Sequence, residues 1–342
     1  MSNSISEERK RVLSGMRPTG KLHLGNYMGA LYNWVRLQSE YECYFFVADL
    51  HALTTDYADP SLIEENTREV ALDFLAAGLD PEDCVIFVQN KVKQHSELHL
   101  YLSMITPLGW LERVPTYKEQ MENLTTKDLH TYGFLGYPLL QSADILIYQA
   151  DFVPVGQDQV AHVEITREIA RRFNQFYRDA RDPEQPILPE PQALLTPSPK
   201  LPGTDGRKMS KSYGNTILLS DPEPVIRQKL KPMVTDPARI RRSDPGNPDL
   251  CPVFDLHKVF SSAGTQEKVR EGCTTAGIGC IECKGWLADA VVAELAPIQE
   301  RRRKYESKPA LVEEILAAGA VRAAGRAEQT MVEVRAAMGL GN

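Results

Sequence analysis

The sequence lacks any long apolar run. No stretch of about 18 consecutive apolar residues occurs in its 342 residues, so no membrane span or membrane partner is predicted. The polar start, MSNSISEERKRVLSG, has no apolar segment typical of a signal peptide, and we expect a cytoplasmic protein. Without an export signal, the six cysteines are not expected to form disulfides.

The chain also lacks an excess of positive charge. Its formal net charge of −7 excludes a globally basic nucleic-acid coat, so a nucleic-acid partner would need local basic patches. Arg239, Arg241, Arg242 and the run Arg301 to Lys304 could form such patches. Runs of this kind are more often solvated helix faces or loops, so on their own they establish no partner.

Strand-like and helix-like patterns alternate in the first part of the chain. Buried-strand patterns cover residues 12–16, 43–48, 85–89 and 152–155, and helical spacing begins after Gly25 and recurs at 61–78, 137–148 and 158–173. This alternation at short spacing is typical of βαβ units. It predicts a Rossmann-like parallel α/β sheet.

The later part of the chain has a different pattern. The strand signal fades after residue 215, and helical patterns cover 222–232, 286–305 and 309–338. We therefore expect a catalytic α/β domain at residues 1–215 and a mostly α-helical region at residues 216–342. The last helix is free to pack back on the catalytic domain.

A glycine-containing turn, SGMRPTGKLHLGNY, leads from the first strand to the first helix. Doubly wound folds hold a nucleotide phosphate at this position. The turn matches neither G-x-G-x-x-G nor a P-loop, so the common fingerprints are absent. His23 and Asn26 are either a turn histidine with an N-cap asparagine or a pair of donors to a triphosphate.

A basic loop, RKMSKSYGN, occupies residues 207–215. Lys208 and Lys211 flank Met209 and Ser210. Taken alone, such a loop is more often solvated than a clamp for a polyphosphate. Glycines on both sides would let it close and open.

One carboxylate, Asp144, lies inside the apolar run SADILIY. Burying an unpaired carboxylate is costly, so this side chain needs a partner. We favour a binding-site carboxylate over a structural ion pair. His51, in DLHAL, is equally consistent with a pocket residue and with a core or turn histidine.

Four cysteines cluster late in the chain. Cys251, Cys273, Cys280 and Cys283 form the pattern C-x21-C-x6-C-x2-C, which favours a bound metal centre over unliganded thiols. Zinc ribbons usually show two tight pairs, and only Cys280 and Cys283 form one here. Dispersed sets of four cysteines also hold iron–sulfur clusters.

HLGN followed by KMSKS resembles the paired signature elements of class I aminoacyl-tRNA synthetases. Over nearly the whole chain, GMRPTGKLHLGN, YFFVADLHALT, YPLLQSADILIY, VPVGQDQVAHVEITREIARRF, KMSKS and AMGLG resemble the tryptophanyl-tRNA synthetases. The cysteine pattern is similar to that of a subset of this family that carries a [4Fe–4S] cluster, with Zn²⁺ as the alternative. The resemblance implies an anticodon-binding helical domain.

The resemblance also implies an activity. L-tryptophan is activated by ATP with Mg²⁺ to tryptophanyl-AMP and pyrophosphate, and is then transferred to tRNA(Trp) by a homodimer. His23, Asn26, Lys208 and Lys211 are then catalytic. The implied ATP-binding residues are Arg17, Pro18, Thr19, Gly25, Asn26, Gly156, Gln157, Asp158, Lys208, Met209, Ser210, Lys211 and Ser212. Gly156 also ends a strand before a helix, where open sheets bind ligands.

For tryptophan, the resemblance implies that Asp144 accepts the indole N–H, while Tyr137 and Gln159 hold the α-amino group. The implied pocket wall comprises Val153, Val155, His51 and Gln141. Gln141 departs from the methionine that many relatives carry. Three alternatives remain open: a tyrosyl-tRNA synthetase, a small-molecule nucleotidyltransferase, and a catalytically silent synthetase paralogue that binds RNA or protein.

Overall fold

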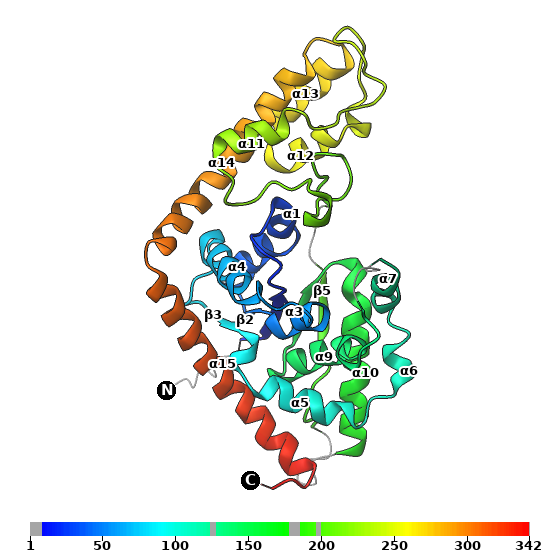
Figure 1. The fold of residues 1–342 in the computed structure, drawn as a ribbon, viewed down its shortest axis with the longest axis vertical. Coiled ribbons are helices and arrows are strands. Elements are labelled where there is room, and N and C mark those ends of the chain that lie inside the picture. Colours follow the sequence, from blue (N-terminus) through cyan, green and yellow to red (C-terminus); the bar gives the residue numbers. More distant parts are fainter. Residues whose placement is uncertain (1–8, 124–127, 178–184, 196–199, 342) are drawn as a thin grey trace, which may run out of the picture.

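The computed structural model describes residues 9–123, 128–177, 185–195 and 200–341 (Figure 1). The side chains of Gln120, Glu122, Asn123 and Asp158 lie outside this described part. A five-stranded parallel sheet has the order β3-β2-β1-β4-β5. Its strands are β1 (Arg11–Met16), β2 (Glu42–Val47), β3 (Cys84–Val88), β4 (Phe152–Val155) and β5 (Gln192–Leu195). The predicted Rossmann-like sheet is confirmed, and β5 is a strand that the sequence patterns did not reveal.

The central strands are buried on both faces. Successive residues of a strand point to opposite faces, so Phe45 joins one apolar cluster and Phe46 joins the other. The Trp34 ring, on α2 (Tyr32–Leu37), stacks on Phe45 with 4.9 Å between ring centroids. On the other face, Phe46 stacks beside Phe87 at 5.6 Å. Burial on both sides explains why β2 and β3 are unbroken apolar runs.

The helices that the periodicity predicts are present. They are α4 (Ile63–Ala77), α9 (Tyr137–Ile147), α10 (Val160–Phe176), α11 (Glu223–Leu230), α14 (Cys280–Glu306) and α15 (Pro309–Ala337). Seven others were not predicted: α3 (Asp49–Asp56), α5 (Gln94–Ser103), α6 (Leu108–Leu111), α7 (Pro115–Asn123), α8 (Tyr132–Leu135), α12 (Pro252–Phe260) and α13 (Ala263–Thr274). Short 3-10 turns are η2 (Gln89–Lys91), η3 (Gln157–Gln159), η4 (Lys211–Tyr213) and η5 (Pro248–Leu250). Of the helices described, none has the length and apolarity of a membrane span.

The first helix is not regular. It begins as α1 (Leu24–Asn26), widens into a π turn, η1 (Tyr27–Leu31), and continues as α2. The sequence pattern predicted a single α-helix here. Wide turns of this kind are rare and occur frequently at functional sites.

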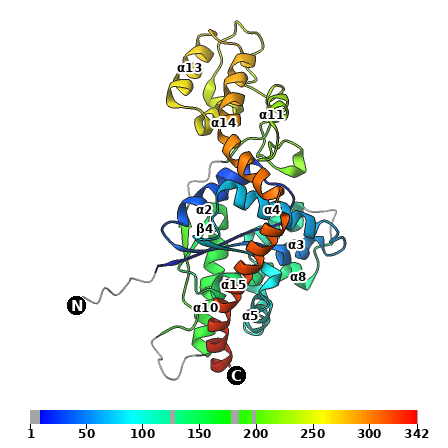
Figure 2. The same cartoon turned by 90° about the vertical axis from the view of Figure 1, so that its left-hand side faces the viewer.

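The later helices divide between two places (Figures 1 and 2). Helices α11, α12, α13 and the first part of α14 form a helical region at one end of the molecule, while the rest of α14 runs beside α4. Helix α15 follows α14 and packs along β3. A Cβ on Gly319 would lie 1.8 Å from the carbonyl oxygen of Ile86, so only glycine lets the helix approach the strand so closely. The last helix thereby adds apolar side chains to the core cluster of Phe46: Ala320, Ala323, Ala327, Met331 and Val334.

Candidate functional site

A cavity of about 1050 Å³ opens where β1 and β4 end. These strands are neighbours in the sheet although far apart in sequence, and open α/β sheets bind ligands at such a switch point. The predicted residues that line it are Arg17, His23, Gly25, Asn26, His51, Tyr137, Gln141, Asp144, Val153, Val155, Gly156, Gln157, Gln159, Lys208, Met209 and Ser210. Of the other predicted residues, Pro18, Thr19, Lys211 and Ser212 are described but are not part of the lining. The side chain of Asp158 lies outside the described residues.

His23 and Asn26 cap the first helix reciprocally. The N–H of Asn26 donates to His23 Nδ1 at 3.3 Å, and the N–H of His23 donates to Asn26 Oδ1 at 3.1 Å. The N-cap is therefore His23, whereas one of the two interpretations of the sequence made Asn26 the N-cap. A Cβ on Gly25 would lie 2.9 Å from the His23 ring, so the glycine makes room for that ring.

The surroundings of His23 determine its protonation state. Burial, and then the charges of Lys211 and Lys208, lower the pKa of His23 to about 4. The ring is therefore neutral near pH 7. Because Nδ1 accepts from the backbone, Nε2 carries the hydrogen and can donate to a ligand.

The two signature segments lie side by side because their backbones pair. The N–H of Leu24 donates to the carbonyl of Ile217, and the N–H of Leu219 donates to the carbonyl of Leu22, both at 2.9 Å. This short antiparallel pairing holds the HLGN turn against the chain that follows KMSKS. It explains how motifs far apart in sequence reach one cavity.

A buried asparagine that the sequence analysis missed organises the KMSKS loop. Asn215 Oδ1 accepts from the N–H of Ser210 at 2.8 Å, and its Nδ2 donates to Asp205 at 2.6 Å. The same Nδ2 donates to the carbonyl of Lys208 at 3.2 Å. A Cβ on Gly203 would lie 2.2 Å from this amide, so Gly203 provides the space for it.

The two lysines of the loop differ in their surroundings. Lys208 is exposed and lines the cavity. Lys211 is half-buried, and its Nζ donates to the backbone carbonyl of Thr19 at 2.9 Å. Burial lowers the pKa of Lys211 to about 8. The loop thus touches the first turn through Lys211 while Lys208 faces the cavity.

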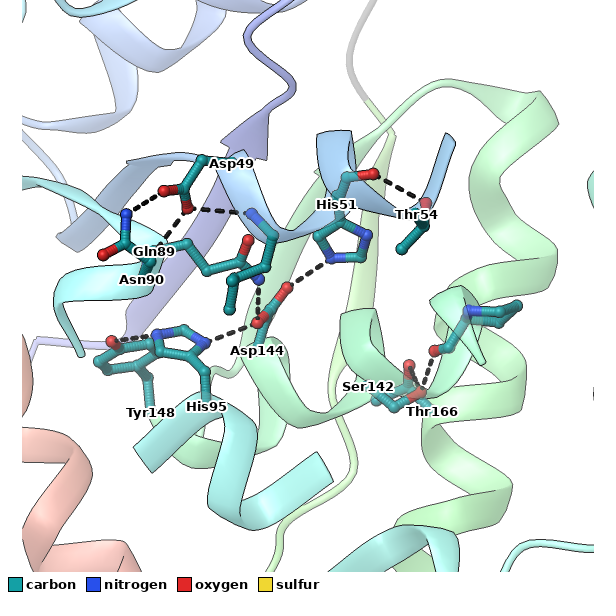
Figure 3. A network of polar contacts seen from close by, with 12 residues as sticks. Asp49, His51, Thr54, Gln89, Asn90, His95, Ser142, Asp144, Tyr148 and Thr166 are labelled. Atoms are coloured by element: carbon teal, nitrogen blue, oxygen red, sulfur yellow. Dashed lines mark hydrogen bonds and ion pairs between the residues drawn. The ribbon is translucent and has the colours of Figure 1, made fainter. Parts of the chain in front are cut away.

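At the other end of the cavity, Asp144 lies in a network of hydrogen bonds (Figure 3). Its Oδ1 lies 2.7 Å from Gln89 Nε2 and 2.6 Å from His95 Nδ1. Its Oδ2 lies 2.8 Å from Nε2 of His51. His51 lines the cavity, which agrees with its interpretation as a pocket residue. The Tyr148 hydroxyl lies 2.8 Å from the other ring nitrogen of His95.

This network keeps Asp144 charged. Burial alone would raise its pKa, but the hydrogen bonds from His51 and His95 outweigh burial and hold the pKa well below its usual value. Burial, and then the charge of Asp144, keep the pKa of Tyr148 well above the ordinary range, so this hydroxyl donates to His95. An ionised carboxylate has about four acceptor positions, and the three bonds leave one on Oδ2.

Two further side chains of the cavity are held by neighbours that the sequence analysis did not find. The Tyr137 hydroxyl lies 2.6 Å from Thr116 Oγ1, which lies 2.6 Å from His162 Nε2. Arg17 donates to Thr55 and lies 3.8 Å from the carboxylate of Asp56, both on α3. Helices α3, α7 and α10 thus hold the side chains of Arg17 and Tyr137, two of the predicted binding residues.

The four late cysteines come from three consecutive helical elements. Cys251 caps α12, Cys273 lies in α13, and Cys280 and Cys283 lie in the first turn of α14. Burial, and then the nearness of the other three thiols, raises the pKa of Cys283 to about 12. Within the described ranges, no set of three or more His, Cys, Asp or Glu stands at the spacing of a metal-ion site.

The chain is similar to known proteins over nearly its full length. Residues 6–296 match the family described as tRNA synthetases class I (W and Y). The tryptophan–tRNA ligase of Thermotoga maritima is 56% identical over 332 residues, which cover 96% of this chain and 99% of that protein. The tryptophan–tRNA ligase of Ralstonia nicotianae is 50% identical, covering 97% and 98%. A crystal structure of tryptophanyl-tRNA synthetase from Campylobacter jejuni, complexed with ADP and tryptophan, has a TM-score of 0.85 and 34% identity, covering 96% and 99%.

Proposed function

The chain belongs to the class I tRNA synthetases, within them to the tryptophan–tRNA ligases, and from that membership we propose how its cavity performs the reaction. It activates L-tryptophan with ATP and transfers the tryptophanyl group to tRNA(Trp). The structural observation that best supports this activity is one cavity with a charged, buried acceptor at one end and both signature segments at the other.

The chemistry has two steps. A carboxylate oxygen of tryptophan attacks the α-phosphorus of ATP, and the bond from that phosphorus to pyrophosphate breaks. A hydroxyl of the terminal ribose of tRNA then attacks the tryptophanyl carbonyl, and AMP leaves. Catalysis of phosphoryl transfer consists mainly of positioning and of stabilising charge that develops on the leaving group.

We assign the phosphate end to ATP. His23 Nε2–H and the Asn26 amide donate near the α-phosphorus, and Lys208 and Lys211 stabilise the departing pyrophosphate. The neutral state of His23 and its place beside both lysines support this assignment. The remaining proposed ATP contacts are Arg17, Pro18, Thr19, Gly25, Gly156, Gln157, Asp158, Met209, Ser210 and Ser212.

Mg²⁺ is expected with ATP. Asp144 is the sole carboxylate among the described residues that line the cavity, and its oxygens already accept three hydrogen bonds. The described lining therefore offers the ion no further carboxylate, which fits a Mg²⁺ held by phosphates and water. Bound in that way, the ion neutralises phosphate charge.

We assign the opposite end to tryptophan. The free acceptor position on Asp144 Oδ2 suits the indole N–H, which is a donor only. Tyr137 and Gln159 hold the α-amino group. The wall consists of Val153, Val155, His51 and Gln141, and all of them line the cavity.

Exchange of labelled pyrophosphate into ATP tests the assignment. We expect exchange that depends on tryptophan and that tyrosine does not stimulate. Exchange stimulated by tyrosine alone would favour a tyrosyl enzyme. No exchange with either amino acid, from protein that still binds tRNA, would favour a silent paralogue.

The four cysteines support a separate proposal, a [4Fe–4S] cluster held by Cys251, Cys273, Cys280 and Cys283. Among the described residues, no set of three or more His, Cys, Asp or Glu is arranged to hold a metal ion. The proposal rests on the pattern C-x21-C-x6-C-x2-C, since sets of four cysteines hold iron–sulfur clusters. Arg239 Nη1, which donates to Cys273 Sγ at 3.6 Å, is the type of donor that cluster sulfurs accept. When bound, such a cluster fixes the loops that carry its ligands.

Iron and sulfide analysis of anaerobically purified protein tests the cluster. We expect iron and sulfide in equal amounts, a broad visible absorption, and loss of both when Cys280 and Cys283 are replaced by serine. One equivalent of zinc without sulfide would support the alternative, and neither metal would overturn the proposal.

We further propose residues 1–215 as the catalytic domain and residues 216–342 as the helical region that meets the tRNA anticodon, with α15 packed on the first domain. The expected assembly is a homodimer, and the expected location is the cytoplasm. Gel filtration with light scattering tests the assembly.

A further inference from the structure

The second half of α14 contacts both signature segments of the cavity. The amide of Gln299 donates to the carbonyls of Leu219 at 3.0 Å and Asp221 at 2.8 Å, just after the KMSKS loop. On the π turn that follows HLGN, the Tyr27 hydroxyl donates to Glu294 at 2.9 Å. The first half of the same helix lies in the distant helical region (Figure 1). One helix therefore holds the two segments that form the phosphate end.

The most buried of these contacts passes through Asp73 of α4. Asp73 Oδ2 accepts from the N–H of Leu22 at 2.7 Å, and Oδ1 forms an ion pair with Arg302 of α14. Arg302 also pairs with Glu69 and Glu306, so all Asp73 variants below are compared with one another at a substituted Arg302. Asp73 is 0% exposed and Arg302 is 3% exposed. Leu22 directly precedes His23, so Asp73 holds the backbone from which this histidine projects.

We propose that Asp73 and Arg302 are positioning residues for the phosphate end of the cavity, through which α14 fixes the HLGN turn. Gln299 fixes the chain after KMSKS in the same way. Neither Asp73 nor Arg302 lines the cavity, so each acts on ATP through the backbone that it holds. The inference rests on the proposed binding of ATP at this end.

A contribution to stability does not by itself explain why Asp73 and Arg302 are buried as an ion pair. Desolvation of two charges offsets most of their attraction, and apolar side chains of similar volume often replace such a pair without loss of stability. Misplacement of reacting groups by about 1 Å, however, costs rate heavily. The bond to Leu22 ties the pair to the site. The pair Arg335 and Glu97, which joins α15 to α5 at 2.7 Å, has no such link and serves as a comparison.

Two double variants separate geometry from charge. Asp73→Leu with Arg302→Met removes both charges and the acceptor for Leu22. Asp73→Asn with Arg302→Gln removes the charges but keeps an amide oxygen for that N–H. In pyrophosphate exchange, we expect the apolar variant, Asp73→Leu with Arg302→Met, to raise KM for ATP about tenfold and to leave KM for tryptophan unchanged. In the polar variant, with Asn and Gln, KM for ATP should lie close to that of the unmodified protein.

Gln299→Leu provides a second test that removes no buried charge, with an expected rise of about threefold in KM for ATP. Thermal unfolding checks that each variant is folded. If the apolar pair does not fold, Gln299→Leu decides. Arg335→Met with Glu97→Gln is the control and should change neither KM.

Equal KM values for ATP in the two Asp73 variants, or parallel rises in KM for ATP and tryptophan, would overturn the proposal. So would an unchanged KM in Gln299→Leu. Failure of the proposed function would look different, because the unmodified protein would then show no tryptophan-dependent exchange.

Discussion

The two ends of the cavity are built differently. At the tryptophan end, Asp144 receives three hydrogen bonds from buried or half-buried side chains, so its carboxylate has one orientation and one charge. At the phosphate end, two chain segments meet through a few backbone bonds, and Lys208 remains exposed beside them. The acceptor end is therefore fixed by buried side chains, whereas we propose that bound ATP completes the phosphate end.

This difference fits the two tasks that we propose for the two ends of the cavity. Rejection of the wrong amino acid requires a polar group that is left unpaired when the wrong ligand binds, so that group must not move. Stabilisation of a leaving pyrophosphate requires cations that meet charge as it develops and then release the product. The predictions below test the two ends separately.

The largest effect is expected from the lysines of the loop. Lys208→Ala with Lys211→Ala should lower the rate of adenylate formation by about a thousandfold, because both cations proposed to stabilise the leaving pyrophosphate are lost. Tryptophan binding, measured by equilibrium dialysis without ATP, should stay nearly unchanged. Lys21→Ala, an exposed lysine of the first turn that does not line the cavity, is the control. Normal turnover in the double variant would remove the loop from the mechanism.

A smaller effect is expected at the opposite end. Asp144→Asn should raise KM for tryptophan about a hundredfold, because the charged acceptor is replaced by a group that must also donate. The ratio of kcat/KM for tryptophan to that for its benzothiophene analogue, which lacks the N–H, should fall toward one. KM for ATP serves as the internal control. A retained preference for tryptophan would show that Asp144 is only structural.

The pH dependence of kcat/KM for ATP tests the phosphate end separately. Lys211 has a pKa lowered to about 8, so it is a cation below that pH and loses its charge above it. We expect kcat/KM for ATP to fall about fivefold between pH 8 and pH 9, and Lys211→Arg to move the fall to higher pH. His23, with a pKa of about 4, should add no inflection near pH 6.5. An inflection there that disappears in His23→Gln would contradict the neutral histidine.

The smallest effect is expected from the tether of the loop. Asn215→Ala removes the side-chain bonds to Ser210, Asp205 and Lys208 and should raise KM for ATP about fivefold. Asn174→Ala is a matched control, because Asn174 holds the backbone of Leu188 by two bonds away from the cavity. Equal changes in both variants would indicate a general loss of stability.

The sequence predicted the sheet better than it predicted the connections. Strands β2 and β3 are apolar on both faces and were found, whereas β5, with Gln192 and Leu195 exposed, has no such pattern. Helix α5 was missed because its polar and apolar residues are not separated by face, although His95, which lies on it, contacts Asp144. Local periodicity carries no information about such contacts.

For the site, residue types were predictable and partners were not. The apolar run around Asp144 implied a partner, but nothing in the spacing identified His95 or Gln89, which reach it from separate segments. Asn215 is the last residue of the loop RKMSKSYGN, so the demand of a tight loop for a side-chain tether could have identified it. The bond between Lys211 and Thr19 joins distant segments and becomes visible only in the folded chain.

Helix α15 has a consequence for synthesis of the protein. The strand β3 lies at the edge of the sheet, and the helix that covers it, with Gly319 against Ile86, is synthesised after all five strands. While the chain emerges from the ribosome, this edge and the apolar face beneath it stay open until residues near Met331 and Val334 have left the exit tunnel. The N-terminal half therefore completes its core only after α15 has been added, and a nascent chain stalled before α15 should require protection by a chaperone.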